Sequence, residues 1–295
     1  MEFGRLVTAM ATPFDSTGAL DESGLKVLIE HLLDTGTTAI VASGTTGESP
    51  TLSHGEKLRL FELTVQYVSG RVPVLAGTGG NNTNTSIQLS KEAVELGVDG
   101  LLLVSPYYNR PSQEGLYAHF RTISESVDVP VMLYNIPSRT GVNIDSDTIL
   151  RLSEVPNIVA VKEASGNFAQ IAQIAAGKTD DFLLYSGDDK FTLPIMALGG
   201  YGVVSVAAHV IGREMTTMID AFVAGNTAEA AVWSGRLLPL FEGLFQSPSP
   251  APLKAALHSL GLPGGQVRLP LVNAPEAVVS HVLAQLEKLG KFQHA

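Results

Sequence analysis

Hydrophobic residues follow two repeating patterns along the chain. Short apolar runs rich in β-branched residues recur, and longer segments with apolar residues at helical spacing separate them. The runs number eight and occupy residues 5–10, 39–43, 72–78, 100–105, 129–135, 158–164, 182–187 and 202–207. Among the helical segments, residues 53–68 begin with Ser53 and Glu56 at the spacing of a capping box. The pattern predicts strands that alternate with helices.

Alternating strands and helices are typical of parallel sheets built from βα units. The runs are almost continuously apolar, which indicates a sheet that is buried on both faces. Eight such units over about 220 residues favour an α/β fold of the (β/α)8 TIM-barrel type. A doubly wound open sheet is the alternative, although no GxGxxG motif follows the first run, which weakens a dinucleotide-binding version of it.

The strand pattern stops near Gly225. Helical patterns follow in residues 228–245, 251–260 and 274–289. A Pro-rich segment, residues 246–252, connects the first two of these helices. We therefore expect residues 1–224 to form the barrel with its active site, and residues 225–295 to form a helical region that packs on the barrel.

Composition and charge exclude several classes of function. The net charge is −10 and no cluster of Lys and Arg is present, so a nucleic-acid surface is not expected. Cysteine is absent, which excludes thiolate chemistry and Cys-ligated zinc. His54 and His119 have no partners at metal-ligand spacing, and Asp188 with Asp189 fits a helix cap better than a cation site. We therefore expect no metal.

Two further features bear on location. The N-terminus has no basic segment followed by an apolar run, so we expect no signal peptide. The uncharged stretch 191–212 contains Pro194 and several glycines, which fit a buried helix, turn and strand better than a membrane span. These features predict a cytoplasmic protein that has no membrane partner.

Polar residues gather where the predicted strands end. In a (β/α)8 barrel, catalytic residues lie at the carboxyl ends of the strands and in the loops that follow. Five predicted strand ends carry distinctive segments, namely GTTGES (44–49), PYYNRP (106–111), YNIPSRTG (134–141), VKEA (161–164) and SGDD (186–189). If the barrel forms, these segments converge on one face.

Lys162 is a charged residue inside a run that otherwise resembles a buried strand. Alternation divides this strand into two faces, Ala160, Lys162 and Ala164 on one side and Val159, Val161 and Glu163 on the other. An amine in the barrel interior is partly desolvated, and lowering its pKa from about 10.4 to about 7 costs roughly 4–5 kcal/mol. A lysine that attacks a carbonyl carbon needs this neutral form. Alternatively, Lys162 pairs with an acid such as Glu163 or Asp188.

Other polar residues are ambiguous when each is considered alone. The GTTGES segment could bind an anion through backbone N–H groups, or it could be an ordinary turn. Tyr107, Tyr108 and Tyr134 could relay protons, or they could be aromatic core residues with satisfied hydroxyls. Arg139 could bind a substrate carboxylate through its planar guanidinium, or it could form a surface salt bridge.

The chain as a whole resembles the dihydrodipicolinate synthase family. This family belongs to the pyruvate-dependent class I aldolases, which also include N-acetylneuraminate lyase. The resemblance covers nearly the whole sequence and depends on the segments GTTGESPTL, AGTGGNNT, PYYNRPSQEGLYAHF, YNIPSRTG, VKEASGN, SGDD and SPSPAPLKAAL. It implies a (β/α)8 barrel with a C-terminal helical region, a homotetramer built as a dimer of dimers, and no cofactor other than a covalent Schiff base with the substrate pyruvate.

The resemblance also implies the catalytic residues. Lys162 corresponds to the lysine that forms the Schiff base with pyruvate. Thr45, Tyr108 and Tyr134 correspond to a proton-relay triad, in which the tyrosine matching Tyr108 reaches into the site of a neighbouring subunit. The implied reaction condenses the pyruvate enamine with L-aspartate 4-semialdehyde and gives 4-hydroxy-tetrahydrodipicolinate and water. This reaction is the first committed step of diaminopimelate and lysine synthesis.

Substrate-binding residues follow from the same resemblance. Thr46 corresponds to the residue that holds the pyruvate carboxylate through its backbone N–H and its hydroxyl. Arg139 corresponds to the residue that binds the carboxylate of L-aspartate 4-semialdehyde. Gly187 and Val204 match positions that line the site.

The chain differs from the lysine-inhibited members of the family at positions that bind the inhibitor lysine. Lysine-inhibited members bind lysine near the positions of Ser49, Pro50, His54, Lys57, Asn81, Thr85 and Tyr107. They typically have a histidine where Lys57 stands and an acid where Thr85 stands. Lys57 repels a cationic ligand and Thr85 removes its charge partner, so we expect weak or absent inhibition by lysine.

Two rival functions stay open from the sequence. Another pyruvate-dependent aldolase, such as an N-acetylneuraminate or keto-deoxy-sugar-acid lyase, would keep Lys162 and Tyr134, although Arg139 and the paired threonines of GTTGE argue against it. A non-catalytic barrel that binds a small acid would not need the full catalytic set.

Overall fold

The structure is a computed structural model that describes residues 3–291. Its parallel strands close into a barrel in chain order, and the last strand pairs with the first. The strands are β1 (Leu6–Ala9), β2 (Ala39–Ala42), β3 (Val74–Gly77), β4 (Gly100–Val104), β5 (Val131–Asn135), β6 (Ile158–Glu163), β7 (Leu183–Ser186) and β8 (Gly202–Ser205). The predicted (β/α)8 barrel is confirmed, and the open doubly wound alternative was wrong because β1 and β8 are hydrogen-bonded neighbours.

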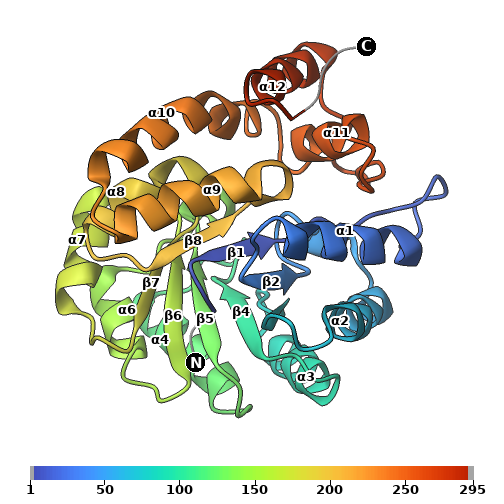
Figure 1. The fold of residues 1–295 in the computed structure, drawn as a ribbon. Helices are drawn as coiled ribbons and strands as arrows, with labels where there is room; N and C mark the ends of the chain where they lie inside the picture. The colour runs from blue at the N-terminus through green and yellow to red at the C-terminus, as the bar shows by residue number, and fades with distance from the viewer. Residues whose placement is uncertain (1–2, 292–295) are drawn as a thin grey trace.

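Helices surround the barrel and continue beyond it at the C-terminus (Figure 1). The helices are α1 (Glu22–Asp34), α2 (His54–Val68), α3 (Thr83–Glu95), α4 (Gln113–Ser124), α5 (Pro137–Thr140), α6 (Ser146–Leu152), α7 (Phe168–Gly177), α8 (Thr192–Ala197), α9 (Ala208–Val223), α10 (Thr227–Gly243), α11 (Ala251–Ser259) and α12 (Glu276–Lys288), with short 3-10 helices η1 (Ser49–Thr51) and η2 (Asp189–Phe191). The predicted capping box is present, because the Ser53 side chain accepts from the Glu56 N–H and the Glu56 side chain accepts from the Ser53 N–H.

The C-terminal helices pack on the barrel and on one another. Helix α10 packs against α9, and α12 packs against α10 and α11. Figure 1 shows α11 and α12, in red, on the same side of the molecule as α1. Within residues 3–291, none of the helices combines the length and apolar character that a membrane crossing requires. The uncharged stretch 191–212 contains α8 and β8, as predicted.

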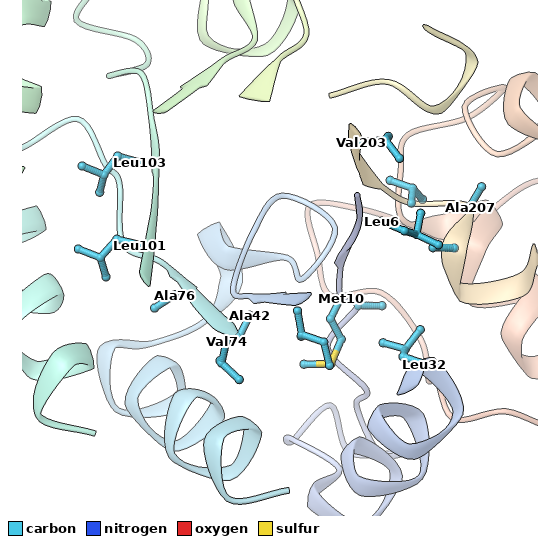
Figure 2. Packing of buried hydrophobic residues seen from close by; sticks show 14 of the residues in the cluster. Leu6, Met10, Leu32, Ala42, Val74, Ala76, Leu101, Leu103, Val203 and Ala207 are labelled. Atoms are coloured by element: carbon cyan, nitrogen blue, oxygen red, sulfur yellow. The ribbon is translucent and has the colours of Figure 1, made fainter. Parts of the chain in front are cut away.

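The strands are buried on both faces, which explains why they are apolar almost throughout. An inner hydrophobic cluster fills the barrel and includes Val7, Val41 and Leu75. An outer cluster lies between the strands and the helices. Figure 2 shows part of this outer cluster, with Leu101 projecting from β4 and Leu32 from α1.

A β-bulge at the start of β6 alters the predicted alternation. Val131 pairs with Ile158, whereas the next residue, Met132, pairs with Ala160. The additional residue, Val159, packs against the inner cluster, so its predicted place on the outer face was wrong. A bulge adds one residue to a strand and shifts the side-chain pattern locally. Beyond it, Val161 joins the outer cluster and Lys162 lies on the inner face, as predicted.

Candidate active site

Lys162 and Tyr134 lie side by side at the carboxyl ends of β6 and β5. The two residues are register partners on neighbouring parallel strands. The Nζ atom of Lys162 lies 4.1 Å from the centroid of the Tyr134 ring. Both side chains are buried, and Lys162 is only 4% exposed. The amine is therefore shielded from bulk water and lies against the face of a phenol.

The surroundings of Lys162 favour its neutral form. Burial lowers the pKa of Lys162 to about 8; the carboxylate of Asp189 opposes this shift and the positive charge of Arg139 adds to it. A shift from 10.5 to about 8 corresponds to about 3 kcal/mol. It is smaller than the shift assumed from the sequence. It still leaves roughly a tenth of the amine neutral at pH 7.

The ion-pair alternative for Lys162 has no support within residues 3–291. Asp188 lies 3.5 Å from Lys190 instead. Glu163 belongs to the opposite face of β6, where its carboxylate accepts a hydrogen bond from the Asn135 side chain at 3.0 Å. Lys162 forms no ion pair with either acid in this part of the chain.

Gly187 provides the space that the Lys162 side chain occupies. A Cβ atom at Gly187 would lie 2.7 Å from Cβ of Ala164 and 3.1 Å from Cγ of Lys162. Any larger residue would therefore displace the lysine. Val204 lies on β8 and belongs to the inner cluster, which also contains Tyr134. Both positions border the barrel interior, where a small molecule bound to Lys162 would lie.

Tyr134 and Thr45 form a hydrogen-bonded pair of hydroxyls. Burial raises the pKa of Tyr134 to about 12, while the charge of Arg139 and the hydrogen bond with the Thr45 side chain act in the opposite direction. The phenol therefore keeps its proton near neutral pH and can donate it. Thr45 is half-buried in the loop after β2, so the pair connects the interior with the mouth of the barrel.

The loop that carries Thr45 and Thr46 is compact and leaves N–H groups free. The Glu48 N–H donates to the Thr45 carbonyl at 3.1 Å, and the Ser49 N–H donates to the Gly44 carbonyl at 3.3 Å. The backbone N–H of Thr46 has no hydrogen-bond partner within the described residues. Free N–H groups in such a turn are suited to an anion, because they point outward from a curved backbone.

Arg139 lies at the mouth of the barrel and lines a cavity of about 390 Å³. Thr45 and Tyr134 line the same cavity. It extends away from them toward the residues Ser49, Pro50, Lys57, Asn81, Thr85 and Tyr107. The Arg139 side chain is exposed. A guanidinium in this position is available to an anionic ligand that enters the cavity.

The structure does not bring Tyr108 to the other predicted residues within one chain. Tyr108 is 90% exposed and does not line the cavity, although its neighbour Tyr107 does. Its backbone has a φ of 73°, in the left-handed region that non-glycine residues seldom adopt. A bulky aromatic side chain held outward by an unusual backbone indicates a function at this position.

The structure shows what each of the paired aspartates does. Asp188 caps η2 by accepting from the Lys190 N–H, as predicted. Asp189 instead reaches the start of α9 and accepts from the Val206 and Ala207 N–H groups at 3.1 and 3.0 Å. Within residues 3–291, no group of three or more acids, histidines or cysteines is placed to hold a metal ion.

Sequence reasoning missed the polar contacts behind the site. Asp189 is buried and influences the pKa of Lys162, but its hydrogen-bond donors come from the segment between β8 and α9, later in the chain. The hydrogen bond between Asn135 and Glu163 joins β5 to β6 beside the site residues. In the sequence, the only indication of the Asn135–Glu163 contact was an acid, Glu163, directly after Lys162 in an apolar run.

Comparisons with known proteins agree over nearly the whole chain. A profile of the Dihydrodipicolinate synthetase family matches residues 2–289. The 4-hydroxy-tetrahydrodipicolinate synthase of Moorella thermoacetica is 53% identical over 98% of this chain and 99% of its own length. A crystal structure of dihydrodipicolinate synthase from Bacillus anthracis is 51% identical, with a TM-score of 0.95 and coverage of 97% and 98% of the two chains. The enzyme from Cyanidioschyzon merolae, solved with lysine bound, is 46% identical, with a TM-score of 0.97 and coverage of 98% and 99%.

Proposed function

The chain belongs to the dihydrodipicolinate synthetase family, and from this premise we propose that it is a 4-hydroxy-tetrahydrodipicolinate synthase whose Schiff base forms on Lys162. Its substrates are pyruvate and L-aspartate 4-semialdehyde. The observation that carries the proposal is the buried amine of Lys162, without an ion-pair partner in the described chain, at 4.1 Å from the Tyr134 ring.

The reaction begins when the neutral amine of Lys162 attacks the keto carbon of pyruvate, and water leaves as the iminium forms. The iminium withdraws electrons, so the pyruvate methyl group loses a proton and an enamine results. The enamine carbon bonds to the aldehyde carbon of the second substrate, whose oxygen takes up a proton. The amine of that substrate then displaces Lys162, which closes the ring. The iminium is the electron sink, so we propose that no cofactor takes part.

Other residues bind the substrates and move protons. Thr46 holds the pyruvate carboxylate through its backbone N–H, which has no hydrogen-bond partner among residues 3–291. Arg139 binds the carboxylate of the aldehyde substrate at the cavity mouth. Tyr134 and Thr45 transfer protons to and from the reacting atoms, since their hydroxyls already form one hydrogen-bonded pair.

Two assays test this function. Pyruvate is incubated with the protein and reduced with borohydride, and the adduct is located by mass spectrometry; we expect it on Lys162. Turnover is then measured with L-aspartate 4-semialdehyde and, separately, with N-acetylneuraminate and keto-deoxy-sugar acids. Preferential turnover of a sugar acid would favour the lyase alternative, and no adduct in folded protein would favour a binding protein.

Adduct formation should depend on pH in a specific way. Only the neutral amine attacks, and a lowered pKa means that this form increases as the pH rises toward about 8. We therefore expect the initial trapping rate to rise about tenfold per pH unit below this value and to level off above it. Single-turnover borohydride trapping across the pH range measures this. A rate that continues to rise to about pH 10, as for an ordinary lysine, would contradict the assigned environment.

We propose that Tyr108 completes the relay of a neighbouring subunit in a homotetramer. Two observations support this proposal: the Tyr108 side chain is exposed, and it does not line the cavity of its own chain. Co-expression of K162M with Y108F chains should restore about a quarter of wild-type activity, because about half of randomly formed dimers are mixed and each has one complete site. Each variant expressed alone is the control. No recovery in mixed oligomers, verified by mass spectrometry, would mean that Tyr108 does not act across subunits.

Lysine feedback should be weak or absent. Lys57 and Thr85 line the outer part of the cavity, where no acidic residue is among the lining residues of the described chain. Burial lowers the pKa of Lys57, which indicates that a second cation there would be costly. We expect millimolar lysine to change the steady-state rate by less than about twofold, in line with the unfavourable like-charge contact. Strong inhibition would contradict this expectation. The double variant K57H/T85E should bind lysine more tightly than the wild type in calorimetry.

A further inference from the structure

One buried ion pair connects the C-terminal helical region to the loop after β2. The Nζ atom of Lys254, on α11, lies 2.6 Å from Oε1 of Glu48, and the two side chains are 2% and 0% exposed. The other carboxylate oxygen of Glu48 accepts from the Arg268 N–H at 2.8 Å. Both partners of the loop carboxylate therefore come from the C-terminal region.

Lys254 is held in one orientation by its surroundings. Its ammonium also donates to the Gln266 carbonyl at 3.1 Å and lies 4.2 Å from the centroid of the Phe14 ring. Burial lowers the pKa of Lys254, while the carboxylate of Glu48 opposes this effect. Neither Lys254 nor Glu48 lines the cavity at the barrel mouth. The pair is therefore not part of the substrate-binding surface.

Arg268 forms a second connection beside the pair. Its guanidinium donates to the carbonyls of Gly18 at 2.6 Å and Thr51 at 3.0 Å, and it pairs with Glu56 at 2.5 Å. It also lies 4.1 Å from the Phe14 ring centroid. The C-terminal segment is thus fixed both to the loop after β1 and to the segment that follows Glu48.

Glu48 is directly coupled to the backbone of Thr45. Its N–H donates to the Thr45 carbonyl, and its carbonyl accepts from the Thr51 N–H at 2.9 Å. Its φ of 54° lies in the left-handed region, which a residue with a side chain adopts only when its surroundings hold it there. Two further side chains bind this loop backbone: the Thr12 hydroxyl donates to the Gly47 carbonyl at 2.7 Å, and the Thr51 hydroxyl donates to the Glu48 carbonyl at 3.0 Å.

We propose that the Glu48–Lys254 ion pair positions the loop of Thr45 and Thr46 for the reaction. Lys254 is then a positioning residue for a site that it does not touch. This inference rests on the proposed function, in which Thr45 transfers a proton and Thr46 binds the pyruvate carboxylate. Without Lys254, the Glu48 carboxylate is left buried with no positive partner among the described residues and keeps the hydrogen bond from the Arg268 N–H. A buried charge in this state moves toward water. The loop would move with it.

The main test compares K254M with K291M. Methionine keeps the length and the contact with Phe14 but removes the charge. Lys291 is the control, because it lies in the C-terminal region and also pairs with an acid, Glu214 on α9 at 2.5 Å, which is not part of the loop after β2. We expect kcat of K254M to fall about tenfold to a hundredfold, because small displacements of reacting groups cause losses of this size. K291M should stay within about twofold of wild type. Borohydride trapping on Lys162 should persist in both.

A double-mutant cycle separates positioning from general damage. In a T45V background the displaced hydroxyl is already absent, so K254M should lower kcat much less than it does in the wild type. A residue with a purely structural role would lower kcat by the same factor in both backgrounds, and this result would overturn the proposal. An unchanged kcat in folded K254M would overturn it as well. K254R, which restores the charge, should recover part of the activity.

Two further measurements keep the test decisive. If K254M does not fold, E48Q replaces it, because glutamine keeps the shape and removes the charge. Amide hydrogen exchange of residues 44–49 should accelerate in K254M and not in K291M, and this readout does not depend on turnover. Unchanged exchange would overturn the proposal. If the wild type itself shows no synthase activity, the proposed function fails, and the exchange data still decide whether the pair holds the loop.

Discussion

Replacement of Lys162 by methionine should abolish synthesis, with kcat falling by roughly 10⁴-fold or more, the scale seen when a covalent nucleophile is removed. No other lysine is placed to take its role in the described chain, because Lys57, which lines the cavity, lies in its outer part. The adduct with pyruvate should also disappear from the borohydride trapping experiment.

The same variant should be more stable than the wild type. The pKa of Lys162 is lowered to about 8, so the folded state disfavours the protonated form, and the penalty applies in full below that pH and fades as the pH rises toward 10.5. At pH 7, K162M should therefore gain up to about 3 kcal/mol in the free energy of unfolding. Denaturant unfolding measures this gain.

A nearby surface lysine provides the matched control. Lys190 is partly exposed and pairs with Asp188 at 3.5 Å, so K190M should keep nearly all activity and change stability by less than about 1 kcal/mol. Measurable turnover by K162M, or an adduct on another lysine, would show that the nucleophile has been assigned to the wrong residue. Loss of activity in K190M as well would point to a general effect of charge at this face.

The barrel could be predicted because each strand has two apolar faces and each helix has one. The same local periodicity placed Lys162 on the inner face. Val159 was misplaced because the bulge depends on how β6 pairs with β5, and pairing is a property of two strands. A pattern read along one strand contains no information about its partner's register.

Contacts between distant segments account for the rest of what the sequence could not predict. Asp189 looked like a cap for the next helix, but its Oδ2 atom accepts from two N–H groups between β8 and α9. Glu48 lies within the GTTGES segment, in which the sequence pointed only to the two threonines as functional residues. Its partner Lys254 lies in the C-terminal helical region. In both cases the acid is buried and its partners come from another element, so hydrophobic periodicity gives no signal for the contact.

Removal of the Tyr134 hydroxyl should produce the second-largest loss. Y134F keeps the ring against the Lys162 amine but removes the phenolic proton and its hydrogen bond with Thr45. Proton transfer by a positioned side chain contributes about 10²–10⁴-fold, so we expect kcat to fall by about 10²–10³-fold. Because the Lys162 amine itself is unchanged, pyruvate should still be trapped on it, although more slowly than in the wild type. Rapid-quench and steady-state rates measure the two effects separately.

Tyr185 is the matched control for this variant, because it is also a register partner of Lys162, on the opposite side from Tyr134. Its hydroxyl donates to the Gly4 carbonyl at 2.9 Å, close to the start of β1 and so at the other end of the barrel. Y185F should therefore lose about 1 kcal/mol of stability while kcat stays within about threefold of wild type. Equal losses of kcat in Y134F and Y185F would mean that packing around Lys162, and not a proton from Tyr134, limits the reaction. A loss confined to Y134F would assign the proton transfer to this hydroxyl, since the two variants remove the same atom from tyrosines on the two strands that flank β6.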